Sequence, residues 1–103
     1  MSTTTEQKRL RAHPGEVLRE EFLAPLGVSR NRLSREAGLA LSAVSAIAAG
    51  RRSVTAETAL RLSRYFGTTP EFWLNLQAAH DLSRARATLG GRVEREVRPI
   101  NAA

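Results

Sequence analysis

Five arginines lie close together between Ser29 and Arg52, where the only acidic residue is Glu36. They are Arg30, Arg32, Arg35, Arg51 and Arg52. Five positive charges against one negative charge give this segment +4, which is most of the net charge of +6 on the whole chain. A local excess of guanidinium groups can bind phosphate, so the first chemistry that the sequence indicates is electrostatic binding to nucleic acid.

The same segment is predicted to fold as two short helices joined by a tight turn. The first helix would cover 30–37, with Ser29 as its cap and Gly38 in a left-handed conformation after it. The second would begin after a capping Ser42 and run to Ala49. The inward apolar residues would be Leu33, Ala37, Leu39, Val44 and Ile47. This spacing predicts a helix-turn-helix, in which the outer face of the second helix is free to enter the major groove of DNA. A plain helix pair within a core has similar spacing and remains an alternative.

Eight residues of this segment are placed to contact DNA. They are Arg30, Asn31, Ser42, Ala43, Ser45, Ala46, Arg51 and Arg52. The four from the second helix would face base edges, and the three arginines would contact phosphates, one of them beside a helix N-terminus. The second helix offers no Gln, Asn or Arg for a bidentate base contact, so sequence specificity would depend on DNA shape, on the arginines or on Asn31. Arg32 and Arg35 are interpreted as solvated surface.

The positions of helix caps and breakers predict an all-α fold of five helices. The expected helices are 14 to 23 or 24, 30–37, 43–49, 56–66 and 70–89. Pro25 should end the first helix, and Gly90 and Gly91 should end the last. The predicted organisation is a flexible N-terminal arm over 1–12, one DNA-binding domain over 13–91 and a short tail over 92–103.

The last predicted helix is too long for a core of this size to cover. From Pro70 to Leu89 it should reach roughly 30 Å. Its apolar residues at the far end suggest a contact with a second subunit or with another protein. The residues assigned to a dimer interface are Trp73, Leu82, Ala85 and Leu89, although Trp73 could equally belong to the core.

Several classes of function are disfavoured by what the sequence lacks. There is no cysteine, and the two histidines are far apart in the sequence with no carboxylate at metal-site spacing, so no metal or cofactor is expected. No nucleophile with a base, paired carboxylates or phosphate loop is recognisable, so an enzyme is not expected. No apolar run reaches the roughly 18 residues of a membrane span, and the N-terminus does not look like a signal peptide, so a cytoplasmic protein is expected.

Several short runs of the sequence form a recognisable set: HPGEVL at 13–18, EFLAPLG at 21–27, AGRR at 49–52, TALRL at 58–62, YFGT at 65–68 and EFWLNLQ at 71–77. Together they resemble the HigA-type antitoxins of the phage-repressor-like helix-turn-helix class. The resemblance covers residues 13 to about 82, and FWLNLQ is its most specific part. It implies a homodimer that represses its own operon by binding double-stranded operator DNA. It also implies a HigB-type toxin partner, a small ribonuclease that cleaves mRNA.

Two other functions fit the same residues. A solitary transcriptional repressor of the same fold would have no toxin partner, and a neighbouring reading frame for a small basic protein would argue against it. A protein-interaction module could use its basic face to bind acidic protein or RNA, and binding to duplex DNA in the presence of competitor would argue against that.

Overall fold

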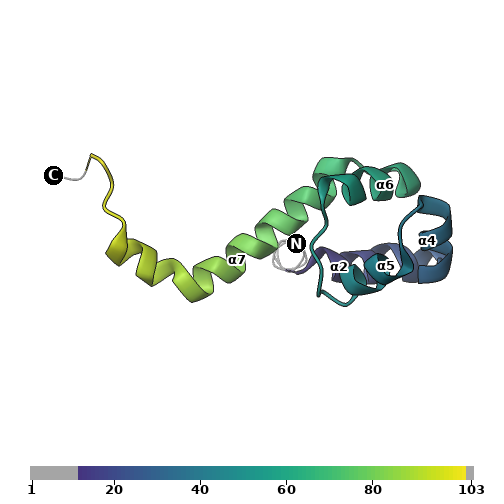
Figure 1. The fold of residues 1–103 in the computed structure, drawn as a ribbon, viewed down its shortest axis with the longest axis horizontal. Helices are drawn as coiled ribbons and strands as arrows, with labels where there is room; N and C mark the ends of the chain where they lie inside the picture. Colours follow the sequence, from purple (N-terminus) through teal and green to yellow (C-terminus); the bar gives the residue numbers. More distant parts are fainter. Residues whose placement is uncertain (1–11, 102–103) are drawn as a thin grey trace, which may run out of the picture.

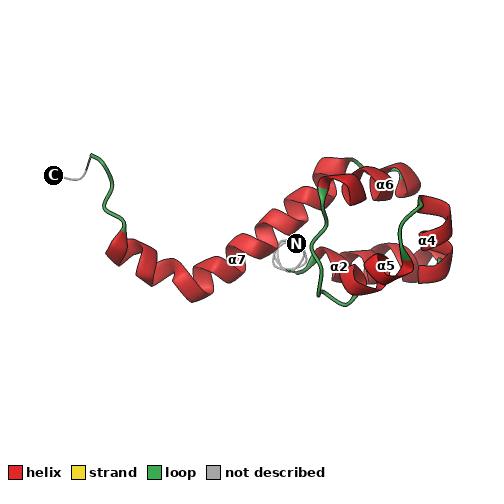
Figure 2. Ribbon diagram, in the orientation of Figure 1, coloured by secondary structure: helices red, strands yellow, loops and turns green. Residues whose placement is uncertain are grey.

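The computed structural model describes residues 12–101, so the predicted N-terminal arm lies almost entirely outside the described residues. All regular structure within 12–101 is helical, which confirms the predicted all-α class (Figures 1 and 2). A continuous first helix over 14–26 has three parts: α2 (Pro14–Val17), η1 (Leu18–Leu23) and α3 (Ala24–Leu26). It is followed by α4 (Arg30–Ala37), α5 (Leu41–Ala48), α6 (Ala56–Phe66) and α7 (Pro70–Glu96).

The first helix continues past Pro25, which the sequence predicted would end it. Its middle part, η1, is a π-helix, and the Ala24 N–H accordingly donates to the Arg19 carbonyl five residues earlier. In an α-helix a proline ring clashes with the carbonyl four residues earlier, and the wider turn of a π-helix before Pro25 can accommodate the ring. The helix ends only at Gly27, which has a left-handed φ of 65°.

The turn between α4 and α5 is tied by Ser34. The Leu39 N–H donates to the Ser34 carbonyl at 3.0 Å, and the Ser34 hydroxyl donates to the Leu39 carbonyl at 2.5 Å. The chain therefore turns early and α5 begins at Leu41, with Ala40 as N-cap and no side-chain hydrogen bond. The prediction that Ser42 caps this helix is wrong, because Ser42 already lies inside its first turn. Ser29 as the cap of α4 and Gly38 as its left-handed end are both confirmed.

Ala40 is the N-cap residue of α5 but has no side chain that can accept a hydrogen bond, so replacing it by serine should stabilise the protein. Ala40 has φ −61° and ψ 138°, the extended conformation in which a serine hydroxyl can accept from the N–H groups of the next turn. Ala40→Ser should raise the free energy of unfolding by about 0.5–2 kcal/mol, measured by urea denaturation. Ser42→Ala is the matched control and should change it by less than about 0.5 kcal/mol, because Ser42 is not the cap. An unchanged Ala40→Ser midpoint would contradict this account of the α5 start.

The last helix, α7, runs through Gly90 and Gly91 to Glu96 and so corrects the predicted end at Leu89. Neither Gly90 nor Gly91 has a positive φ. Two helical glycines cost roughly 2 kcal/mol together, which lowers helix stability without breaking the hydrogen-bond ladder. An ion pair from Arg92 to Glu96 at 3.0 Å supports the turn after them. The helix therefore takes in residues 92–96 of the predicted tail and ends before Val97.

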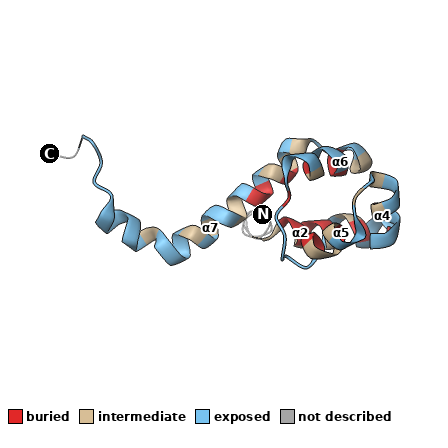
Figure 3. Cartoon of the chain, in the orientation of Figure 1, coloured by how far each residue is buried: buried red, intermediate tan, exposed pale blue. Residues whose placement is uncertain are grey.

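The core lies where the first helix, α4, α5, α6 and the start of α7 meet, as the buried residues in Figure 3 show. An aromatic cluster of Phe22, Phe66, Phe72 and Trp73 joins the first helix to α6 and α7. Trp73 is 0% exposed, and its ring N–H donates to the Thr68 hydroxyl at 2.9 Å. It is a core residue with no surface to offer a second chain, which corrects its assignment to a dimer interface. Figure 1 shows the remainder of α7 projecting away from this core.

Candidate nucleic-acid interface

The two helices of the predicted motif pack as their spacing indicated. Leu33 of α4 and Val44 and Ile47 of α5 are buried, as is Ala48, which the sequence analysis did not assign. The predicted inward residues Ala37 and Leu39 are partly buried against the same core. Of the four predicted base-facing residues, Ser42 is exposed, whereas Ala43, Ser45 and Ala46 are half-buried at the sides of α5. The outer face of α5 is therefore shallow and built from small side chains.

The N-terminus of α4 presents two of the predicted contact residues to solvent. The Ser29 hydroxyl accepts from the Arg32 N–H at 3.0 Å and so fixes where the helix begins. Arg30 and Asn31 occupy the first two helical positions, and both are exposed. Main-chain N–H groups at this end of a helix have no partner within it, so a guanidinium beside them suits an anion such as phosphate.

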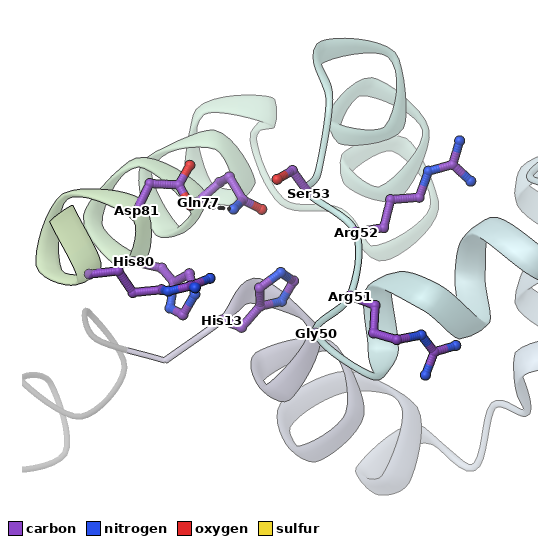
Figure 4. Close-up of a pocket in the computed structure, with 9 residues that line it drawn as sticks. His13, Gly50, Arg51, Arg52, Ser53, Gln77, His80 and Asp81 are labelled. Carbon is purple, nitrogen blue, oxygen red and sulfur yellow. Dashed lines mark hydrogen bonds between the residues drawn. The ribbon is translucent and has the colours of Figure 1, made fainter. Parts of the chain in front are cut away.

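Arg51 and Arg52 stand on a loop whose backbone is held from both sides. At its start, Gly50 has a φ of 77°, and the Arg51 N–H donates to the Ala46 carbonyl at 2.9 Å. At its end, the buried Val54 N–H donates to the Gln77 side-chain oxygen at 2.8 Å. Both arginines are exposed, and Figure 4 shows their side chains pointing away from His13 and α7. The loop thus offers two cations on a fixed backbone.

The arginines of the surface differ in whether they have ionic partners. Arg32 pairs with Glu36 at 3.0 Å, and hydrogen bonds from Tyr65 and then from Arg32 hold the pKa of the Glu36 carboxyl below its usual value. Within residues 12–101, Arg30, Arg51 and Arg52 form no ion pair. Arg35 forms none there either, so of the five arginines between Ser29 and Arg52 only Arg32 is paired within 12–101, and the other four keep their charge available for another molecule.

Residues that the sequence analysis did not assign hold this surface together. At Gly15, an added Cβ would lie 1.8 Å from the Ile47 carbonyl oxygen, so α2 and α5 touch backbone to backbone there. The Arg19 guanidinium donates to the Ala48 carbonyl at the end of α5. Arg61 of α6 does the same for the Ala37 carbonyl of α4, at 3.2 Å. Nothing in the types or spacing of these residues distinguished them from ordinary helix-surface positions.

Gln77 is another residue that sequence reasoning missed, and its removal should destabilise the arginine loop. Gln77→Met keeps the size of the side chain but leaves the buried Val54 N–H without an acceptor, at a cost of about 1–3 kcal/mol. Thermal unfolding would measure the loss. Asp81→Ala is the control, because it removes only the exposed partner of the other Gln77 hydrogen bond, and its effect should be smaller. Equal effects of the two variants would contradict the role given to the Val54 bond.

The two histidines, far apart in the sequence, meet in the structure. Their ring centroids are 5.0 Å apart in a small pocket of about 100 Å³ beside Gly50 and Asp81 (Figure 4). His13 is the side-chain cap of α2, since its Nδ1 accepts from the Gly15 N–H at 2.9 Å. Burial, and after it the neighbouring His80, lower the pKa of the His13 imidazole and so favour the neutral form that this cap needs. Within residues 12–101, no three histidine, aspartate or glutamate side chains lie close enough together to hold a metal ion.

The α4–turn–α5 unit, with its inner face in the core and its outer face free, defines a helix-turn-helix protein. The Helix-turn-helix family model matches residues 18–73, which is more than half of the chain. No helix within 12–101 is long and apolar enough to span a membrane.

Comparison with known proteins narrows this class to one family. The chain is 39% identical to the Pseudomonas aeruginosa antitoxin HigA in a structure with the higBA promoter, with a TM-score of 0.84 over 87% of this chain and 98% of that one. It is 48% identical to a HigA-family addiction module antidote protein from Coxiella burnetii, with a TM-score of 0.82 over 86% and 97%. Antitoxin HigA-1 of Vibrio cholerae is 41% identical over 75 residues, which cover 73% of this chain and 70% of that protein. The chain belongs to the HigA family of helix-turn-helix antitoxins.

Proposed function

We propose that this protein is the antitoxin of a type II toxin–antitoxin module. It binds operator DNA as a dimer, represses its own operon and neutralises a HigB-type ribonuclease toxin. The observation that carries the DNA-binding part is the free outer face of α5, with the unpaired Arg30 at the start of α4 and the unpaired Arg51 and Arg52 after the end of α5. The likeness to a HigA structure with its promoter supports the same reading.

The arginines and the helix face have separate tasks in this binding. Arg30, with the N-terminus of α4, holds a phosphate at one edge of the major groove, and Arg51 and Arg52 hold phosphates at the other. These contacts fix the position and angle of α5 but carry no sequence information. The outer residues of α5 then meet base edges, with Asn31 as the one nearby amide able to form a bidentate contact with adenine.

The part of α7 beyond the core supplies the surface for a second copy. From Asp81 onward no residue of the helix is buried, and Leu82 and Leu89 are about half exposed on the same side as the half-buried Ala85. A free helical arm with an apolar stripe is poorly stable in water, and pairing with the same stripe of another copy covers it. A dimer would present two α5 helices to half-sites about one turn of DNA apart.

A charge placed in the apolar stripe of α7 should dissociate this dimer. Leu89→Glu should convert a sedimenting dimer into a monomer at micromolar concentration, because burying an unpaired carboxylate costs several kcal/mol. Ala87→Glu adds the same charge to an exposed position on the opposite side of α7, and it should remain dimeric. A wild-type chain that sediments only as monomer, or a Leu89→Glu variant that stays dimeric, would contradict this interface.

The antitoxin role is tested by expressing the full chain together with the product of the neighbouring reading frame. The tagged antitoxin should co-purify with that product, and the complex should no longer cleave mRNA that the free partner cleaves. The complex should then be titrated against the operator duplex. An active ribonuclease in the presence of excess antitoxin would overturn the neutralising role. Operator binding with no co-purifying partner would identify a solitary repressor instead.

A further inference from the structure

We infer that α5 reads operator DNA through the methyl groups of thymine, and that Leu41 makes the principal contact. This inference rests on the proposed DNA-binding function and specifies the chemistry of its reading surface. It concerns a residue that the sequence analysis placed outside the site, because the helix was expected to begin two residues later.

Leu41 is the first residue of α5, and its side chain is 45% exposed. The buried face of the helix consists of Val44, Ile47 and Ala48, which reach the core without it. A helix N-terminus is a position where polar residues are usual, since the N–H groups there have no partner within the helix. In the proposed complex, Leu41 is therefore an apolar side chain at the end of α5 that would enter the groove first.

The other predicted base-facing residues of α5 all have small side chains. Ala43 and Ala46 contribute one methyl group each, and Ser42 and Ser45 contribute single hydroxyls. No side chain of this face has the two parallel hydrogen-bonding groups that would distinguish guanine or adenine. The face can make close apolar contacts, and it can make few polar ones.

The major groove offers one apolar group, the C5 methyl of thymine. A leucine packed on that methyl removes both from water, while the arginines at either end of the motif supply the attraction to the duplex. Cytosine lacks the methyl group, so this contact distinguishes a T·A base pair from a C·G base pair without a bidentate hydrogen bond. An apolar recognition surface flanked by unpaired cations fits a thymine-containing groove better than it fits an apolar protein surface.

The experiment removes the methyl group from the DNA. A duplex that the full-length protein selects from a random library serves as the probe, and dU replaces dT first throughout and then at single positions, which preserves base pairing. The wild-type chain should bind about four-fold more weakly for each contacted methyl lost. Leu41→Ala should bind dT and dU alike at one position in each half-site. The control Leu60→Ala, which alters a 59% exposed leucine on α6, should keep the full penalty.

The possible outcomes distinguish thymine reading by α5 from DNA binding itself. Selection of no duplex would overturn the proposed DNA binding itself. Selection of a duplex whose dT and dU forms bind the wild type equally would overturn thymine reading and leave DNA binding intact. A dU penalty that persists in Leu41→Ala would remove Leu41 from the contact, and a dU penalty lost in Leu60→Ala as well would show that both variants act through the fold.

Discussion

Gly15→Ala should destabilise the protein by about 3 kcal/mol or more, the upper end of what overpacking costs. The added Cβ would lie 1.8 Å from the Ile47 carbonyl oxygen, 2.8 Å from its carbon and 3.1 Å from the Ala48 Cα. All three are backbone atoms, so no side chain can rotate out of the way. The first helix and α5 would have to separate, and the reading helix would move with respect to the arginines that flank it. Urea denaturation of the variant would measure the loss.

Gly90→Ala is the matched control for this substitution. Gly90 lies in α7, has no positive φ and has nothing within 4 Å of the position of an added Cβ. Alanine there should stabilise the helix by about 0.5–1 kcal/mol, because glycine loses more conformational freedom on folding. The same chemical change should therefore have opposite signs at the two positions. A Gly15→Ala variant as stable as wild type would show that α2 and α5 are not in backbone contact.

Removal of Arg30, Arg51 and Arg52 together should nearly abolish DNA binding. Each lost phosphate contact lowers the slope of log K against log salt by about 0.9, so the triple alanine variant should lose roughly 2.7. Counterion release alone then predicts a loss of affinity of about 10²–10³-fold at 0.1 M salt. The loss should be nearly equal on operator and scrambled duplexes, because phosphate contacts carry no sequence information.

A second triple variant controls for net charge. Its substitutions are Arg64→Ala, Arg86→Ala and Arg98→Ala, at exposed positions of α6, α7 and the tail. It loses as many positive charges as the first variant, but far from α5. It should reduce the salt slope by much less than the first variant. Equal slopes for the two triple variants would mean that binding depends on total charge, and the arginines beside α5 would then have no special position.

Local signals predicted most of the fold because each acts within one turn of helix. Ser29, Thr55 and Thr69 cap α4, α6 and α7 through their own hydroxyls, and Gly38 ends α4 in a left-handed conformation. Val44 and Ile47 face the core because their spacing of three fits one side of a helix. Residues of this kind carry their structural role in their type and spacing.

The predictions that failed concern residues whose effect depends on neighbours. Pro25 breaks an α-helix but is accommodated when the preceding turn is a π-helix. Gly90 and Gly91 weaken a helix by an amount that its other turns can offset. Ser42 would cap α5 if the turn were longer, but Ser34 draws the turn tight and the helix starts earlier.

The candidate site was predicted in part. Arg30, Arg51 and Arg52 are exposed as expected, since unpaired charges near helix ends stay in water, and the polar Asn31 beside Arg30 is exposed as well. The residues that position them could not be found, because Gly15 and Gln77 act across 32 and 23 residues of sequence, on Ile47 and Val54 respectively. Leu41 was missed for a different reason, since its place on the surface follows from where α5 begins.

The proposed DNA-binding surface consists of the start of α4, the outer face of α5 and the loop that carries Arg51 and Arg52, and it can be tested residue by residue. Titration of the ¹⁵N-labelled full chain with its selected duplex, followed by amide chemical shifts, reports which segments meet DNA. We expect the largest changes at 29–31, 41–46 and 50–53, with the exposed side of α6 little affected. Shifts concentrated on α6 or on α7 beyond Asp81, with α5 unchanged, would contradict it.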